Sequence, residues 1–299
     1  MRQELFVFLN QKNILKYLYK TGKYEIFEAA NMRQESDKAL NNLPWDCFGT
    51  IPDNYQQLPP EKQKSAGYGA LKIDDIVNDI RPDVYIGSED IWAFTNFHHK
   101  PWWNKIKCMV WTTLDSLPIL PQAIEYAPRI KDYYVWSSFA EKAFKEMGYE
   151  HIKTLRGSLD TNNFFKIPDE NKSLLRRSNG IDDDTFVIGF VFRNQLRKSV
   201  PNLLDGFKKF KKDHPKSKLL LHTHWSEGWD IKRLIDEKSI NINDVLTTYF
   251  CSSCNRYKVK PFSGQENQCP FCGEKKLNTT NTKDGVSESQ LNEVYNLMD

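Results

Sequence analysis

Residues 186–222 read FVIGFVFRNQLRKSVPNLLDGFKKFKKDHPKSKLLLH, and this stretch decides the fold of the 299-residue chain. Its apolar ends, FVIGFVF and LLLH, are typical of strands that are buried on both faces of a parallel sheet. Between them, Ser199 can cap a helix that has Pro201 in its first turn, and leucines and phenylalanines then recur at helical spacing. The stretch therefore predicts a right-handed strand–helix–strand unit.

A basic loop joins the first strand of this unit to the helix and carries Arg193, Arg197 and Lys198. It should lie at the carboxyl edge of the sheet, where the amides and the dipole of the following helix favour an anion. Arginine and lysine would add fixed positive charge for a phosphate or diphosphate. The same cations also suit an ordinary solvated loop, so the loop alone leaves both interpretations open.

The chain upstream repeats this alternation of strands and helices. A helix is expected over residues 73–80, and Ser138 with Glu141 predicts a capping box at the start of another. Strands are expected over residues 84–87, 106–111, 133–137 and 151–155. Repeated units with strands this apolar predict a doubly wound parallel sheet.

Length and composition fit two globular domains, which we place at residues 1–165 and 166–299. Hydrophobic residues make up 39% of the chain and aromatic residues 13%, which argues against disorder. No apolar run approaches the ~18 residues of a membrane span, and LFVFL near the start is shorter than the core of a secretory signal. We therefore expect a cytoplasmic protein. The net charge of +3 is too small to demand a polyanionic partner.

Four cysteines form two Cys-x-x-Cys pairs, and they are Cys251, Cys254, Cys269 and Cys272. The spacing is typical of a zinc ribbon, in which four thiolates hold one tetrahedral zinc ion. Four protein ligands leave no open position on the metal, so the zinc would be structural and no catalytic metal is expected. Disulfides are disfavoured, because a cytoplasmic chain stays reduced.

The expected ribbon, residues 249–276, interrupts the second domain between a predicted strand, NDVLTTYF, and a predicted helix, VSESQLNEVYNLMD. It would lie at the same carboxyl edge as the basic loop, either as a surface insertion or in contact with a substrate. The segment has five cations against two anions, and ribbons bind nucleic acid in other settings. A nucleic-acid-binding or protein-interaction module is therefore the alternative hypothesis. It explains little of the chain, so nucleic acid is not the expected partner.

Residues 157–213 resemble the domain junction of group 1 (family 4-like) glycosyltransferases with the GT-B fold. In that family a Gly-x-x-Asp-x-x-x-Phe segment ends the first domain, and Gly157, Asp160 and Phe164 match it. A following arginine and lysine hold the nucleotide diphosphate of the sugar donor, and Arg193 and Lys198 match these. The resemblance covers residues from about 71 to 299, with the cysteine segment as an insertion.

This resemblance implies two Rossmann-like domains of an α/β protein. It also implies transfer of a sugar from a nucleotide-diphosphate donor to a hydroxyl on a glycan, lipid or protein, with retention of configuration. The departing diphosphate would help to deprotonate the acceptor, so neither a general base nor a divalent metal is required.

Three further residues are candidates at the site. Asp115 follows the predicted strand 106–111, where the family often carries a polar or acidic group, and is the candidate catalytic residue. Capping of a loop turn is the alternative role for it. His222 and Thr223 follow the second strand of the carboxyl-terminal domain and should face the donor crevice.

Both ends of the chain depart from the family pattern. No glycine-rich turn follows the first residues, which predicts that the first strand is replaced or that the chain starts after it. In the family, the helix that corresponds to residues 288–298 is followed by a strand and by a loop with two glutamates that hold the donor sugar and ribose. The chain stops at Asp299, so we expect an incomplete second domain with weak transferase activity.

Overall fold

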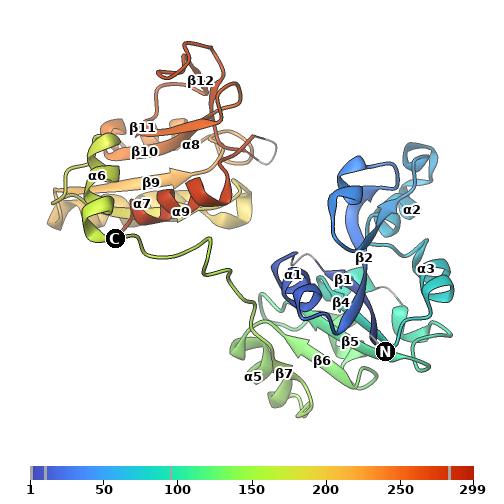
Figure 1. The fold of residues 1–299 in the computed structure, drawn as a ribbon. Helices are drawn as coiled ribbons and strands as arrows, with labels where there is room; N and C mark the ends of the chain where they lie inside the picture. The colour runs from blue at the N-terminus through green and yellow to red at the C-terminus, as the bar shows by residue number, and fades with distance from the viewer. Residues whose placement is uncertain (1–2, 10–11, 95, 282–283) are drawn as a thin grey trace. The chain divides into compact units, whose positions relative to one another are not determined.

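A computed structural model describes residues 3–9, 12–94, 96–281 and 284–299. The chain forms two compact units, residues 1–159 and 160–299, each with its own core (Figure 1). The division falls before Asp160, whereas the sequence predicts a boundary after Phe165. Residues 160–165 belong with the second unit because Phe165 donates its backbone N–H to the Asn292 side chain at 3.0 Å.

A seven-stranded sheet in the order β3-β2-β1-β4-β5-β6-β7 forms the first unit, and every neighbouring pair is parallel. The strands are β1 (Gln3–Leu9), β2 (Tyr24–Gln34), β3 (Asp46–Ile51), β4 (Val84–Ser88), β5 (Lys107–Thr112), β6 (Asp132–Val135) and β7 (Lys153–Thr154). The helices are α1 (Lys12–Lys20), α2 (Pro60–Gly67), α3 (Ile73–Ile80), α4 (Pro121–Tyr126) and α5 (Ser138–Glu146).

Side chains of successive strand residues enter two different cores. Tyr85 of β4 packs in the cluster that contains Val77 of α3 and Phe144 of α5. Ile86, the next residue, packs in the cluster that contains Leu15 of α1. Helices therefore cover both faces of the sheet, which is the doubly wound arrangement that the sequence predicts.

Two details of the first unit differ from expectation. A first strand, β1, is present in the middle of the sheet, so the expectation that it is replaced is wrong; residues 10 and 11, where a turn would follow, lie outside the described residues. Ser137 rather than Ser138 caps α5, and its hydroxyl accepts the backbone N–H of Ala140 at 3.2 Å. The Glu141 side chain therefore takes no part in capping the helix, and it accepts the backbone N–H of Thr154 at 2.8 Å.

A six-stranded sheet forms the second unit, with a path β12-β13-β10-β9-β8 and β11 added on β10. The strands are β8 (Phe186–Val191), β9 (Ser217–His222), β10 (Val245–Cys251), β11 (Arg256–Pro261), β12 (Glu266–Asn267) and β13 (Leu277–Thr279). The helices are α6 (Asp169–Ser178), α7 (Val200–Asp213), α8 (Ile231–Glu237) and α9 (Glu288–Asn296). In the described part of the chain, no helix combines the length and the apolar character needed to cross a membrane.

The predicted strand–helix–strand unit is confirmed as β8–α7–β9, with β8 and β9 parallel. All three leucines of β9 are fully buried, as expected for a strand covered on both faces. β8 differs because β9 is its one strand partner in the described sheet, and Phe186 is 47% exposed. Ser199 precedes α7 but does not cap it: its φ of 49° is left-handed, whereas a capping residue needs an extended backbone.

The cysteine segment continues the sheet of the second unit. The first residues of β10, 245–247, pair in parallel with β9, and its last residues, 249–251, pair antiparallel with β13. β11 lines the other side of β10 along residues 246–251. One strand therefore belongs to both the Rossmann-like sheet and the segment that carries the cysteines.

The close approach of two strand backbones at Gly49 gives a test of the first unit. A Cβ atom there would lie 2.3 Å from the Gln34 carbonyl oxygen, beside the register shift between β2 and β3. Gly49→Ala should therefore lower the unfolding free energy by about 1–3 kcal/mol, measured by urea denaturation with hydrogen exchange of each unit. Gly206→Ala in α7 is the control, because no atom lies within 4 Å and helix propensity should add about 0.5–1 kcal/mol. Equal stability of Gly49→Ala and wild type would contradict the tight packing.

Candidate functional site

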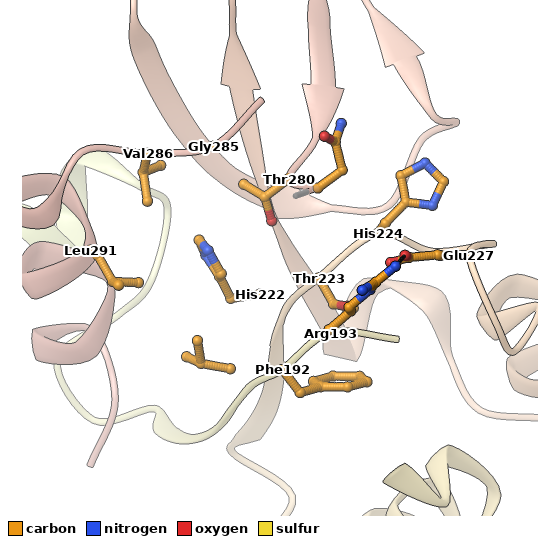
Figure 2. Close-up of a pocket in the computed structure, with 12 residues that line it drawn as sticks. Phe192, Arg193, His222, Thr223, His224, Glu227, Thr280, Gly285, Val286 and Leu291 are labelled. Carbon is orange, nitrogen blue, oxygen red and sulfur yellow. Dashed lines mark hydrogen bonds and ion pairs between the residues drawn. The ribbon is translucent and has the colours of Figure 1, made fainter. Parts of the chain in front are cut away.

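A pocket of about 380 Å³ lies in the second unit at the carboxyl ends of β8 and β9 (Figure 2). Arg193 follows β8, and His222 and Thr223 lie at the end of β9. Thr280 follows β13, and Leu291 of α9 also lines the pocket. The carboxyl edge of a parallel sheet is where open α/β folds bind their ligands. The structure thus brings three of the predicted site residues, Arg193, His222 and Thr223, to one pocket.

Three polar atoms in the wall of the pocket are buried without a hydrogen-bond partner among the residues that the structure describes. They are Nδ1 of His222, Oγ1 of Thr223 and Oγ1 of Thr280. Thr223 and Thr280 are each only 3% exposed. Because more than about 90% of buried polar groups in proteins are bonded, three unpaired atoms around one space point to a polar ligand. Figure 2 shows Thr280 and His222 facing this space.

Burial keeps the His222 ring neutral. Desolvation lowers the pKa of His222 from 6.5 to about 4. Near neutral pH the imidazole therefore carries one N–H donor and one acceptor nitrogen and no charge. The ring can position a ligand by hydrogen bonding, while positive charge for an anion must come from elsewhere.

That charge comes from Arg193, which is paired with a carboxylate. Arg193 donates to Oε1 of Glu227 from Nε at 2.7 Å and from Nη2 at 2.5 Å, and the two side chains lie side by side in Figure 2. The hydrogen bond to Glu227 raises the pKa of Arg193. The arginine side chain remains 55% exposed, so its guanidinium can exchange partners. Glu227 was not anticipated from the sequence, because it lies 34 residues away.

A buried asparagine fixes the loop that carries Arg193. Asn194 is 1% exposed and donates to the carbonyl oxygens of His224 at 3.0 Å and Trp229 at 2.7 Å. Its side-chain oxygen accepts the Trp229 N–H at 2.9 Å. Gly228 lets the loops approach, since a Cβ there would lie 2.5 Å from the Asn194 carbonyl oxygen. The hydrogen bonds of Asn194 thus hold the loop after β8 and the loop after β9 together.

The other two predicted residues lie outside this pocket. Lys198 ends a short 3-10 turn, Leu196–Lys198, is partly buried and is not part of the pocket lining. Asp115 lies in the first unit, exposed in the loop after β5. No hydrogen bond of its carboxylate occurs among the described residues, so the turn-capping role has no support there.

Two carboxylates that follow β4, the strand next to β5, were not predicted from the sequence. Glu89 and Asp90 follow β4, which adjoins β1 where the strand order of the first sheet reverses. Burial, followed by repulsion from Asp90, raises the pKa of Glu89. Asp90 accepts a hydrogen bond from the Thr113 hydroxyl. Paired acidic residues directly after an apolar strand were the available signal.

The four cysteines meet in one cluster. Their sulfur atoms all lie within 4.8 Å of one another, with Sγ–Sγ distances of 3.7 Å for Cys251–Cys272 and for Cys254–Cys269. A zinc ion with Zn–S bonds of about 2.3 Å holds its sulfurs about 3.8 Å apart at the corners of a tetrahedron. The cluster therefore fits a tetrahedral metal ion.

Both halves of the cluster have the same backbone turn. The residue after each Cys-x-x-Cys pair, Asn255 or Gly273, has a positive φ. Each donates its N–H at 2.9 Å to the carbonyl of the first cysteine of its pair, Cys251 or Cys269. Phe271 also directs its N–H to the Cys269 sulfur at 3.4 Å, which favours a thiolate there. The backbone is organised around the sulfurs on both sides.

A second group of possible metal ligands, His98, His99 and Glu125, lies in the first unit. Nη1 of Arg129 lies 3.2 Å from Nε2 of His98 and donates to Glu125 at 2.8 Å. A guanidinium already occupies the space between these ligands, and its charge would repel a metal cation. The cysteine cluster is the better metal site.

No family model matches the chain, and no curated protein matches it in sequence. Solved structures do match. A glycosyltransferase from Rickettsia africae shares 14% identity with a TM-score of 0.57, over 82% of this chain and 67% of that one. Trehalose-6-phosphate synthase from E. coli, bound with UDP-2-fluoro glucose, shares 12% identity with a TM-score of 0.55, over 99% and 77%. MnaA from S. aureus, in a structure with UDP, shares 10% identity with a TM-score of 0.50, over 82% and 67%.

The fold is that of GT-B proteins. The expectation of an α/β chain with two Rossmann-like domains is confirmed. The structural neighbours include UDP-sugar epimerases as well as glycosyltransferases, one of them a UDP-N-acetylglucosamine 2-epimerase with a TM-score of 0.51, 9% identity and coverage of 82% and 68%. At these identities the likeness establishes the fold alone.

The neutral His222 gives a test of the pocket. In the unfolded chain this ring binds a proton near pH 6.5, and in the folded chain only near pH 4. The unfolded state therefore binds more protons between these values, and the second unit should lose stability as pH falls through that window. NMR titration of the histidine ring protons should show His222 neutral down to about pH 4. His222→Gln should remove this part of the pH dependence. A His222 resonance that titrates near pH 6.5 would contradict the buried site.

Proposed function

We propose that this chain is a glycosyltransferase, of the group 1 family that its sequence resembles, which uses a nucleotide-diphosphate sugar as donor. The observation that carries the proposal is the pocket after β8 and β9. It combines an exposed cation that can bind an anion, Arg193, with three buried polar atoms that have no hydrogen-bond partner among the described residues. A diphosphate would engage the guanidinium, and donor hydroxyl or carbonyl groups would satisfy Thr223, Thr280 and His222.

The structural neighbours support this choice of ligand. Two proteins of the same fold were solved with UDP or UDP-2-fluoro glucose. A pocket of about 380 Å³ falls in the usual range for small-molecule sites, about 300–1,000 Å³. We propose a nucleoside diphosphate as the part of the donor that the second unit binds.

The proposed chemistry is electrostatic. The bond between the anomeric carbon and the diphosphate oxygen breaks, the acceptor oxygen bonds to that carbon from the same face, and its proton passes to the departing diphosphate. Configuration is retained. Arg193 stabilises the charge that builds on the leaving group. The resemblance assigns Lys198 to the same diphosphate, and because Lys198 lies outside the pocket lining, that role would require its side chain to rearrange. Neither a catalytic metal nor a separate base is required for this route.

The Glu227 carboxylate would compete with a bound diphosphate for Arg193. This carboxylate holds the guanidinium that a diphosphate would need, and it lines the same pocket. A diphosphate would therefore compete with Glu227 for the Nε and Nη2 donors of Arg193. This competition makes the affinity depend on Glu227 as well as on Arg193.

We propose that the acceptor, a hydroxyl of a glycan, lipid or protein, meets the first unit, and that Asp115 is a residue that contacts it. The exposed position of Asp115 after β5 supports this role. We propose a cytoplasmic location, because four cysteines that are arranged to hold a metal ion must stay reduced, and the cytoplasm keeps thiols reduced.

Isothermal titration of the full chain with UDP and a panel of nucleotide sugars tests the proposal. Arg193→Ala should weaken binding about ten-fold or more, because a charge-assisted contact contributes roughly 1.5–3 kcal/mol. Glu227→Gln should tighten binding, since it removes both the competing partner and a like charge. Arg197→Ala is the matched control, because Arg197 is an exposed cation of the same loop outside the pocket lining.

Other results would point elsewhere. Equal affinity of wild type and Arg193→Ala would reject the diphosphate site. Conversion of a UDP-sugar without any acceptor would indicate an epimerase instead of a transferase. Salt-sensitive binding of RNA or DNA with no response to nucleotides would favour the module built around the cysteine segment.

A further inference from the structure

The segment after β10, residues 252–279, forms an arm whose cysteine end has very little core of its own. The buried cluster there consists of Tyr249 and Cys251 of β10 with Cys269 and Leu277 of the arm. β11 is held differently, because Val259 is fully buried in the cluster that contains Leu246 and Val294. Hydrophobic burial therefore fixes β11, and a bound metal would add the free energy that fixes the cysteine end of the arm.

One face of the arm supports the loop that carries Glu227. Phe262, directly after β11, stacks on Trp225 with ring centroids 3.9 Å apart and an interplanar angle of 5°. Trp225 is 1% exposed and donates its ring N–H to Thr247 of β10 at 2.8 Å. The loop after β9 therefore rests on the arm two residues before Glu227.

A glutamine of the arm bridges the two sides of the pocket. Nε2 of Gln265 donates to the Ser226 hydroxyl at 3.0 Å, next to Glu227. Oε1 of the same side chain accepts the Thr279 hydroxyl at 2.6 Å, next to Thr280. Thr280 in turn directs its N–H to the Thr248 carbonyl of β10 at 3.4 Å. Gln265 thus bonds to a residue next to the wall on each side of the pocket, beside Glu227 and beside Thr280.

We propose that the four cysteines bind one structural zinc ion and that this zinc sets the affinity of the pocket for a nucleoside diphosphate. The element that links the two sites is the folded arm. Zinc fixes the arm, the arm holds Phe262 and Gln265, and these hold the loops that carry Glu227 and Thr280. The coupling rests on the proposed function, whereas the zinc site does not. By linkage, a ligand in the pocket must also tighten zinc binding.

The zinc site is tested by the metal content of the purified full chain. We expect about one zinc per chain. Cys254→Ser should lose most of it, and hydrogen exchange should then accelerate in β12 and β13 while β8 and β9 stay protected. Cys47→Ser, a thiol of the first unit, is the control and should keep the zinc. Metal-free wild type with a fully protected arm would overturn the site.

The coupling is tested with UDP as the probe. Removal of zinc from wild type by a chelator should weaken UDP binding about ten-fold or more, and returned zinc should restore it. UDP should slow zinc release, followed with a coloured chelator. Unchanged UDP affinity after complete zinc loss would overturn the coupling.

A variant that leaves the cysteines in place separates the link from the metal. Gln265→Ala should keep the zinc and weaken UDP binding about three- to ten-fold, since two hydrogen bonds are lost. Gln268→Ala is the matched control, because that side chain donates within the arm, to the Gly273 carbonyl. Equal affinity in both variants would overturn the bridge. If wild type binds zinc but no UDP, the proposed function and the coupling both fail, and the zinc site stands.

Discussion

Much of the second unit depends on the double pairing of one strand. β10 completes the parallel sheet with β9 through its first residues and forms an antiparallel sheet with β11 and β13 through its last ones. A strand has only two edges, so the arm can attach here only because β9 stops at His222 and leaves the rest of that edge to β13. The same geometry carries Thr280 to the carboxyl ends of β8 and β9. The pocket wall is therefore a consequence of the strand pairing.

Within the pocket, rigid and exchangeable parts are clearly separated. Asn194 joins the loops after β8 and β9 through three hydrogen bonds and is buried, so these loops hold their place. The neighbouring Arg193 is exposed and bound to one carboxylate, which another anion can replace. A fixed backbone beside a replaceable ion pair suits selective binding of an anion, because only the side chain has to rearrange.

The sequence predicted the parts of this protein whose signals are local. The apolar strands, the helix at residues 200–213 and the paired cysteines were all recognisable from spacing, and a doubly wound parallel sheet followed from the alternation of strands and helices. The GT-B fold was implied by the resemblance of residues 157–213 to a known family. Glu227, Gln265 and Thr280 were missed, because each acts through a partner that is distant in the sequence. Exposure of β8 was missed too, since periodicity shows an apolar strand but not whether it lies at a sheet edge. Ser199 looked like a cap by residue type, and its left-handed backbone removed that role.

The ion pair of Arg176 with Asp299 affects when the second unit can complete its folding during synthesis. This guanidinium is 3% exposed and donates to both carboxylate oxygens of Asp299, 123 residues later, at 3.0 Å each. The same carboxylate accepts the backbone N–H of Val187 in β8. During synthesis, Arg176 near the start of the unit therefore cannot form this ion pair until residue 299 has emerged from the ribosome. The first unit lacks this constraint and can fold while the second is still being translated.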